Sequence, residues 1–313
     1  MSTPTVMTVR GPLAANELAF TQTHEHLLIN VEWIETRFAL DGILDDEDLA
    51  SEELAAFKAG GGSSVVDLTN IGLRRNPLAV RRISEHTGVN VVLGCGWYRQ
   101  PYYPAEALID RTSTGALAER LIHDIECGLD GTDIRPGIIG EIGSHKEYVT
   151  AQEERVFRAA GRAAVRSGLG LITHSAGSPI GLDHLRILCD EGVDPRRVAI
   201  GHSDSYLRLA YHEAVLQQGA YVEFDNIGYI PPLVASLESR LIEMILELTR
   251  RGWAKQIVIG QDICHRSHLK AYGGNGYDYI LTQFLPRLRA AGLDEESIHL
   301  ITIDNPRRLL TGE

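Results

Sequence analysis

Eight short, apolar, β-rich runs alternate with longer amphipathic stretches along the 313 residues of this chain. The runs span residues 19–26, 64–70, 90–98, 137–143, 170–176, 198–204, 220–228 and 256–262. Strands that alternate with helical stretches are typical of βα units packed around a parallel sheet. Eight such units are also the number that closes a (β/α)8 barrel.

Three of the stretches between the runs carry helix start and stop signals. Residues 45–60 begin with acidic residues and end at a glycine, and residues 113–131 open with Ser and Thr. Residues 150–168 begin with Thr150 and carry Glu153 three positions later, which is the spacing of a capping box. All three stretches are expected to form helices.

An open, doubly wound sheet is the alternative to a closed barrel. Such sheets usually carry a glycine-rich phosphate loop after the first strand, whereas the first run of this chain ends in THEHLL. No linker, low-complexity tract or short repeat interrupts the chain. The sequence therefore predicts a single α/β domain over residues 1–313, folded as a closed (β/α)8 TIM barrel.

Composition narrows the class of protein. The chain has 30 Lys+Arg against 42 Asp+Glu, a formal net charge of −12, and lacks the concentrated basic stripe of a nucleic-acid-binding surface. No apolar run approaches the roughly 20 residues of a membrane span, and the N-terminal residues lack a secretory signal pattern. The four cysteines have no paired spacing and are expected to be free thiols. We expect a cytoplasmic protein that binds neither nucleic acid nor membranes.

Chemically active side chains gather at the ends of the predicted strands, where the active sites of such barrels form. These residues are His24, His26, Asp67, Tyr98, Glu141, His174, His202, Asp225 and Asp262. Four of the twelve histidines therefore fall at one level of the predicted barrel, which a random distribution would not produce. The sequence places a candidate site there.

His24 and His26 stand two residues apart, so both side chains of a strand would point to the same face. Imidazole is a ligand of zinc and similar transition metals, although an isolated pair of this kind is more often structural. His174 and His202 at matching strand ends favour the metal. Together these residues predict a metal site.

Two carboxylates complete the candidate ligand set. Glu141 lies within GIIGEIG, where small and apolar neighbours predict burial, and a buried carboxylate needs a salt bridge or a metal. It could bridge two cations, a place for which the nearby Lys146 is less suited. Asp262 ends the last run and could instead cap a loop. Four histidines and two carboxylates are enough for two metals about 3.5–4 Å apart.

The motifs THEH, ITHSA and IGHSD and the closing aspartate, in this order, resemble the phosphotriesterase family of the amidohydrolase superfamily. The resemblance covers nearly the whole chain, including the terminal stretch LITIDNPRRLL. It implies a distorted barrel of the amidohydrolase type with a binuclear metal centre, usually zinc, with manganese, cobalt or iron as alternatives. It also suggests a homodimer.

The resemblance assigns the ligands between two metals. His24, His26 and Asp262 would hold the more buried ion, and His174 and His202 the more exposed one. The family's bridging residue is often a carboxylated lysine, and Glu141 stands in its place. Together with GWYRQPYYP and DGTDIRPGIIGEIG, this glutamate is similar to the branch of phosphotriesterase homology proteins and argues against efficient phosphotriester hydrolysis.

Catalytic and substrate-binding roles follow as hypotheses. Asp262 would take the proton of the attacking hydroxide and pass it to the leaving group, and Tyr98 would bond the developing oxyanion unless it is a packing residue. Arg266, in the last predicted loop, could hold an anion or pair with a neighbouring acid. Tyr229 replaces the lysine that related branches use for phosphorylated sugar lactones.

The sequence leaves more than one role open for the other polar residues at or near the predicted strand ends. Asp67 and Asp225 could orient a ligating histidine or form salt bridges inside the barrel. His265 and His268 are interpreted as loop or substrate-pocket residues. No G-x-S-x-G elbow is present, which argues against a serine hydrolase.

Several functions remain in competition. The leading hypothesis is a metal-dependent hydrolase that opens a small lactone or carboxylic ester through a metal-bridging hydroxide. The alternatives are an N-acyl amino acid amidase and a weak, promiscuous phosphotriesterase. A barrel that binds a small molecule without turnover is the hypothesis from another class, and it does not explain the complete ligand set.

Overall fold

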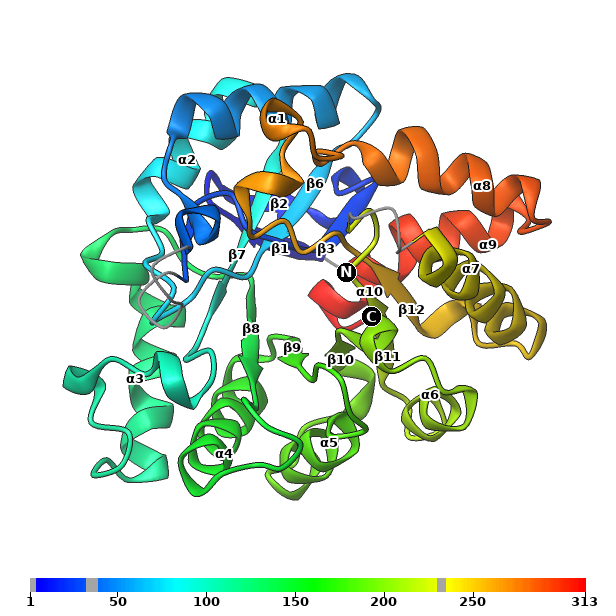
Figure 1. Ribbon diagram of the computed structural model, residues 1–313. Coiled ribbons are helices and arrows are strands. Elements are labelled where there is room, and N and C mark those ends of the chain that lie inside the picture. The colour runs from blue at the N-terminus through cyan, green and yellow to red at the C-terminus, as the bar shows by residue number, and fades with distance from the viewer. Residues whose placement is uncertain (1–3, 32–38, 230–234) are drawn as a thin grey trace.

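The computed structural model describes residues 4–31, 39–229 and 235–313, and its centre is an eight-stranded parallel sheet (Figure 1). Along the sheet the order is β12-β11-β10-β9-β8-β7-β6-β3. Its strands are β3 (Thr21–Glu25), β6 (Ser64–Asp67), β7 (Asn90–Cys95), β8 (Ile138–Gly143), β9 (Leu171–His174), β10 (Val198–Gly201), β11 (Tyr221–Phe224) and β12 (Ile257–Ile259).

The two edges of this sheet meet and form a barrel. Past the end of β12, the backbone N–H groups of Gln261 and Asp262 donate to the carbonyl of His24 on β3, over 3.3 and 3.0 Å. The hydroxyl of Thr23 donates to the Ile259 carbonyl at 3.2 Å. The (β/α)8 prediction is therefore confirmed, and the doubly wound alternative is excluded because such a sheet stays open.

Helices surround the barrel (Figure 1). The α-helices are α1 (Glu47–Ala59), α2 (Pro77–Thr87), α3 (Thr114–Cys127), α4 (Ala151–Ser167), α5 (Gly181–Asp190), α6 (Leu209–Leu216), α7 (Ala235–Arg250), α8 (Leu285–Ala290), α9 (Glu295–His299) and α10 (Asn305–Thr311). The three helices expected from their end signals are α1, α3 and α4. The capping box of α4 is present, with Thr150 and Glu153 each bonding the other's backbone N–H.

The amino ends of the strands enclose an aliphatic core. A hairpin of β1 (Thr5–Thr8) and β2 (Gly11–Ala14) and the C-terminal α10 pack against this end, so both chain termini lie near the barrel. A small second hairpin joins β4 (Ile29–Asn30) to β5 (Ile43–Leu44). The core includes Val6, Val66, Val92, Ile138, Ile172, Ala199, Val258 and Leu309, each at most 2% exposed.

The inward-facing positions of the strands continue from this core to the carboxyl end of the barrel. Because side chains alternate between the two faces of a strand, residues two and four positions after an interior residue also point inward. Ile172 is followed in this way by His174, and Tyr221 by Asp225. The carboxyl end of the barrel is therefore polar where the amino end is aliphatic. Among the described residues, no helix combines the length and apolarity needed to cross a bilayer.

Candidate metal centre

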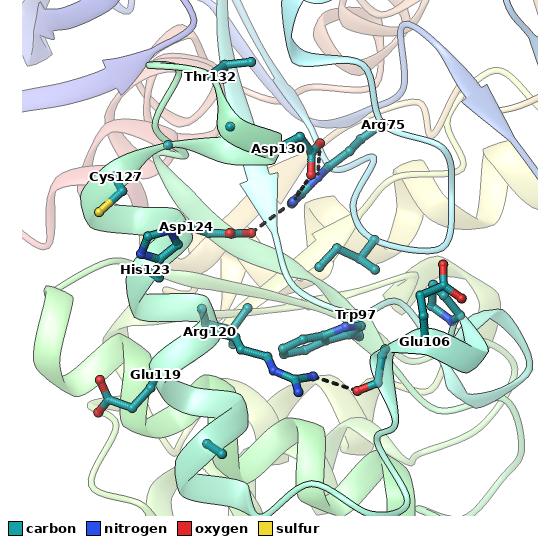
Figure 2. Close-up of a pocket in the computed structure, with 17 residues that line it drawn as sticks. Arg75, Trp97, Glu106, Glu119, Arg120, His123, Asp124, Cys127, Asp130 and Thr132 are labelled. Carbon is teal, nitrogen blue, oxygen red and sulfur yellow. Dashed lines mark hydrogen bonds and ion pairs between the residues drawn. The ribbon is translucent and has the colours of Figure 1, made fainter.

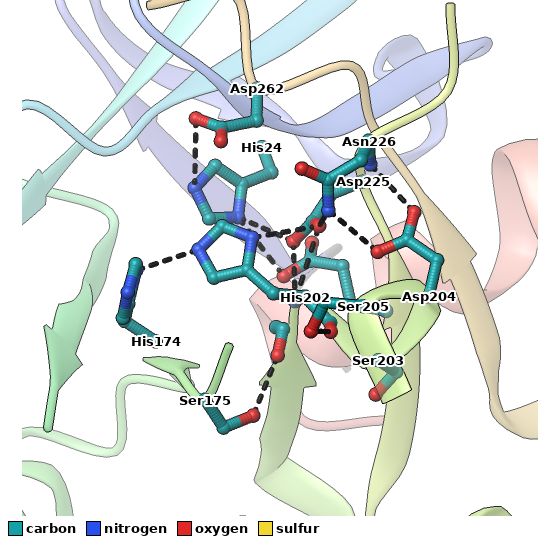
Figure 3. Close-up of polar contacts among 12 residues, drawn as sticks. His24, His174, Ser175, His202, Ser203, Asp204, Ser205, Asp225, Asn226 and Asp262 are labelled. Carbon is teal, nitrogen blue, oxygen red and sulfur yellow. Dashed lines mark hydrogen bonds and ion pairs between the residues drawn. The ribbon is translucent and has the colours of Figure 1, made fainter. Parts of the chain in front are cut away.

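The six residues predicted as metal ligands meet at the carboxyl ends of the strands, and Figure 3 shows four of them, His24, His174, His202 and Asp262. They are His24 on β3, His26 directly after it, Glu141 on β8, His174 at the end of β9, His202 after β10 and Asp262 after β12. None is more than 9% exposed. Strands far apart in sequence thus place four imidazoles and two carboxylates in one buried cluster.

Glu141 stands between the histidines. Its Oε1 lies 3.7 Å from His26 Nε2, and its Oε2 lies 2.9 Å from His174 Nδ1 and 3.3 Å from His202 Nε2. Oε2 also lies 3.7 Å from His24 Nε2, so Oε1 faces His26 and Oε2 faces the other three histidines. On the side of His26, the Asp262 Oδ1 atom lies 3.2 Å from the His26 Nε2 atom. Two cations held by these groups would share the Glu141 carboxylate.

A register shift turns Glu141 inward. Ile138 belongs to the core inside the barrel, so strict alternation would point Gly140 and Ile142 inward and Glu141 outward. The pairing of β8 with β9 shifts between Ile139 and Ile142, and Ile142 packs in the outer core with the helices. Bulges of this kind redirect side chains near active sites.

Left-handed backbone brings two more groups into the cluster. His202 has φ +53° and Asp262 has φ +49°, a region that non-glycine residues seldom adopt and that is enriched at functional sites. A close approach supports the same edge of the barrel, since a Cβ on Gly260 would lie 2.9 Å from the backbone nitrogen of His24. Only glycine allows β12 to come this near to β3.

Outer partners set the tautomers of the ligand histidines. Asp225 lies 2.9 Å from Nδ1 of both His24 and His202, and the Thr69 hydroxyl lies 2.9 Å from Nδ1 of His26. A proton held on each Nδ1 would leave Nε2, on the side of Glu141 and Asp262, as the atom that binds a metal. Asp225 thus contacts two candidate ligands. Asp67 positions Thr69, because it accepts the backbone N–H of Thr69 at 2.9 Å.

The cluster is electrostatically suited to cations. Burial would raise the pKa of Glu141, but His174 and His24 hold it well below its ordinary value. Burial would lower the pKa of His24, but Asp225 and Glu141 raise it well above the usual range. The Nε2 atoms of His24 and His174 are buried without a hydrogen-bond partner in the described structure. Unpartnered nitrogens beside ionised carboxylates fit a pair of divalent ions.

The two tyrosines named from the sequence both reach the cluster. The Tyr98 hydroxyl lies 3.2 Å from His174 Nδ1, and the Tyr229 hydroxyl donates to Asp262 Oδ2 at 3.3 Å. Burial, with Glu141 nearby, raises the pKa of Tyr98 well above its ordinary value. Both phenols are therefore protonated at neutral pH and able to donate a hydrogen bond.

Arg266 is held by a distant segment of the chain that includes β5. Its Nε donates to the Ile43 carbonyl at 2.7 Å, and its Nη2 pairs with Asp45 at 3.2 Å. These contacts tie the guanidinium to β5 and the residue after it, and within the described ranges no hydrogen bond or ion pair joins it to the six cluster residues. The sequence left open whether Arg266 holds an anionic ligand or pairs with a neighbouring acid. In the structure it pairs with an acid, Asp45.

Arg99 is the cation that sequence reasoning missed. Its guanidinium carbon lies 4.8 Å from the centre of the Tyr98 ring and 5.0 Å from that of Tyr102. Its Nε is buried without a partner, and no described carboxylate forms an ion pair with it. The signal was present in GWYRQPYYP, where the arginine directly follows the tyrosine of the predicted strand end.

A separate cavity of about 860 Å³ lies outside the barrel, between α3 and the loops after β6 and β7 (Figure 2). Its buried cation, Arg75, pairs with Asp124 at 3.0 Å and with Asp130 at 2.8 Å. Arg120 donates to the Ala107 carbonyl at 2.7 Å. These groups partner one another, and none of the six candidate metal ligands lines the cavity.

Comparison with known proteins agrees with this geometry. Residues 4–310 match the phosphotriesterase family. This chain belongs to that family. It is 35% identical over 290 residues to the phosphotriesterase homology protein of Escherichia coli, covering 92% of this chain and 96% of that protein. The branch predicted from Glu141 is therefore confirmed within the phosphotriesterase family.

Two other similar proteins are named as hydrolases. The N-acetyltaurine hydrolase of Dictyostelium discoideum is 31% identical over 296 residues, covering 91% of this chain and 79% of that protein. The crystal structure of the lactonase Lmo2620 from Listeria monocytogenes is 29% identical with a TM-score of 0.89, and the match covers 99% of both chains. Membership supports a metal-dependent hydrolase.

Proposed function

We propose that this protein is a binuclear, metal-dependent hydrolase that opens a small lactone or carboxylic ester. The observation that carries the proposal is the position of Glu141, whose two oxygens face different groups of histidines. Zinc is the proposed metal because the donor set consists of imidazoles and carboxylates. When bound, two such ions would supply an activated water and a Lewis acid for the substrate carbonyl.

The residues around the metals supply proton transfer and orientation. Asp262 accepts the proton of the attacking water and delivers it to the leaving oxygen. The Tyr229 hydroxyl donates to Asp262 Oδ2 and so fixes the orientation of that carboxylate. Tyr98 donates a hydrogen bond to the oxygen on which negative charge develops.

A second candidate is the hydrolysis of an N-acyl compound that carries an anionic group. The observation that favours it is Arg99, a half-buried guanidinium without a described ion-pair partner, stacked on the ring of Tyr98. A planar guanidinium binds carboxylates and sulfonates through paired hydrogen bonds. A relative named as an N-acetyltaurine hydrolase, whose substrate bears a sulfonate, supports this choice.

Both candidates are tested by one hydrolysis screen of the metal-loaded protein. Neutral lactones, phosphorylated lactones, N-acyl amino acids, N-acyltaurines and phosphotriesters are compared, with Asp262→Asn as the control. We expect Asp262→Asn to lower kcat by about 10²–10⁴-fold, the usual contribution of a general acid–base group. Turnover that persists in this variant would contradict the role of Asp262, and silence across the panel would favour a binding barrel.

Two arginine variants then identify the anion contact. Arg99→Ala is expected to raise KM for anionic substrates by about 10-fold or more, equivalent to about 1.4 kcal/mol, and to leave KM for neutral lactones little changed. Arg266→Ala removes a guanidinium of the same loop-rich rim and is the matched comparison. A selective effect of Arg266→Ala instead would restore the role expected from the sequence.

A further inference from the structure

A second group of metal-ligating side chains lies in the loop after β12, outside the six-residue cluster. Cys264, His265 and His268 each offer a ligand atom, and these atoms all lie within 4.8 Å of one another. The Cys264 Sγ atom is 3.1 Å from His265 Nδ1, and the two imidazole rings have centroids 5.0 Å apart. One thiol and two imidazoles therefore converge within a five-residue segment.

Local structure holds these three side chains together. The backbone N–H of Cys264 donates to His268 Nδ1 at 3.4 Å, and the N–H of His268 donates to the His265 carbonyl at 3.1 Å. Ser267 is fixed from outside, because its N–H and hydroxyl donate to the two oxygens of Asp41 at 2.7 and 2.8 Å. The loop is thus preorganised by its own hydrogen bonds and by a second segment of the chain.

The donors differ in chemistry from those of the buried cluster. All three residues are half-buried, so an ion could reach them from solvent without opening the barrel. A thiolate with two imidazoles selects zinc and similar soft or borderline ions. Three protein ligands leave one position of a tetrahedral ion for water.

We propose that Cys264, His265 and His268 form a third metal site, specific for zinc-like ions, at the rim of the barrel. Binding breaks the S–H bond of Cys264, forms a sulfur–metal bond and releases the proton to solvent, while the two imidazoles bind as neutral ligands. No redox change is involved. The site shares no ligand with the proposed binuclear centre.

The position of this site predicts its effect on the reaction. The Tyr229 hydroxyl lies 3.4 Å from Cys264 Sγ and 3.3 Å from Asp262 Oδ2, so it links the thiol to the proposed proton carrier. A metal on the sulfur changes the charge beside this tyrosine and places an ion at the entrance. Excess zinc is therefore expected to inhibit turnover, an expectation that rests on the proposed function.

The direct test is cobalt titration of the full chain under reducing conditions. Only a thiolate ligand gives an intense sulfur-to-cobalt charge-transfer band, and the six residues of the buried cluster include no cysteine. We expect the band to develop after the first two equivalents of cobalt have bound. Cys264→Ser should lose the band and the third equivalent, because an alcohol is a poor ligand, and His268→Ala should weaken the third binding step.

Cys189→Ser is the matched control, since Cys189 is also a half-buried free thiol but lies on α5. It should keep the band. Absence of the band in the unmodified protein at cobalt excess, or its persistence in Cys264→Ser, would overturn the site. Circular dichroism and retention of the first two equivalents show that each variant has folded, and His265→Ala gives a second, independent loss of a ligand.

A kinetic test separates the site from its proposed effect. Inhibition by excess zinc, measured relative to each variant's own uninhibited rate, should be relieved in Cys264→Ser and retained in Cys189→Ser. Equal inhibition of both variants would contradict the inhibitory role while leaving the spectroscopic result intact. A protein without turnover would refute the proposed function alone, because the cobalt band needs no substrate.

Discussion

The two ends of the barrel are built from the same strands and differ in almost every physical property. The amino end is filled by side chains such as Val66, Ile172 and Val258, which gain about 25 cal/mol for each Å² of apolar surface removed from water. Two to four residues later the same strands contribute His174 and lead to Asp262. There, burial opposes the charged forms, and each group needs a partner.

This difference indicates that the two ends of the barrel have separate roles. The aliphatic end needs only close packing, whereas the polar end needs the hydrogen bonds of Asp225 and Thr69 and, in the proposed function, would also need the charge of bound cations. Stability should therefore depend chiefly on the first end, and metal affinity on the second. Four substitutions test this contrast.

The largest expected effect is on the aliphatic end. Ile172→Ala removes a fully buried side chain from the barrel interior and should lower the free energy of unfolding by about 2–5 kcal/mol, through lost burial and the cavity left behind. Denaturant unfolding of the metal-free protein measures this loss. The metal affinity of the folded fraction should be unchanged, and a large loss of affinity would contradict the separation of the two ends.

Glu141→Gln should have the next largest effect and act at the polar end. An amide bridges cations poorly, so we expect metal affinity to fall by more than about 100-fold, beyond the range typical of outer partners. Equilibrium dialysis followed by elemental analysis measures the occupancy. Full occupancy in this variant would remove Glu141 from the centre and, with it, the observation on which the proposed function rests.

Asp225→Asn and Thr69→Val should have the two smallest effects on metal affinity, and the effect of Thr69→Val should be the smaller of the two. Asp225 orients two histidines and Thr69 orients one, and loss of such a partner typically weakens metal binding 10–100-fold. We expect Asp225→Asn near the upper end of this range and Thr69→Val near the lower end. Competition with a chelating dye gives both constants, and equal losses would show that the count of oriented histidines does not set the affinity.

The fold was largely predictable because its signals are local. Each strand run is a short β-rich segment that stands apart from the longer amphipathic stretches, and the Thr150–Glu153 capping box lies within four positions. The types of ligand were predictable for the same reason, since barrel sites form at strand ends whatever the loops do. The order of the motifs THEH, ITHSA and IGHSD and the final aspartate then indicated the phosphotriesterase family.

The contacts of the rim were not predictable in this way. Arg266 and Arg99 both follow a strand of the barrel, and the sequence alone favoured the first as an anion contact. The partner that holds Arg266 is a carbonyl on β5, 223 positions away along the chain. Such a contact depends on how distant loops pack, for which the sequence around Arg266 has no signal.

By itself, the sequence determined that eight strands would form a barrel and that histidines and carboxylates would lie at their carboxyl ends. The sequence also placed Glu141 and His202 in the candidate site, but only the tertiary structure shows how their side chains reach it. Alternation along an ideal strand points Glu141 outward, and it is the shift of β8 against β9 that reverses it. The left-handed backbone of His202 is held by Asp225 on the neighbouring strand. Both features arise between strands, where pairing and packing override the preference of any single segment.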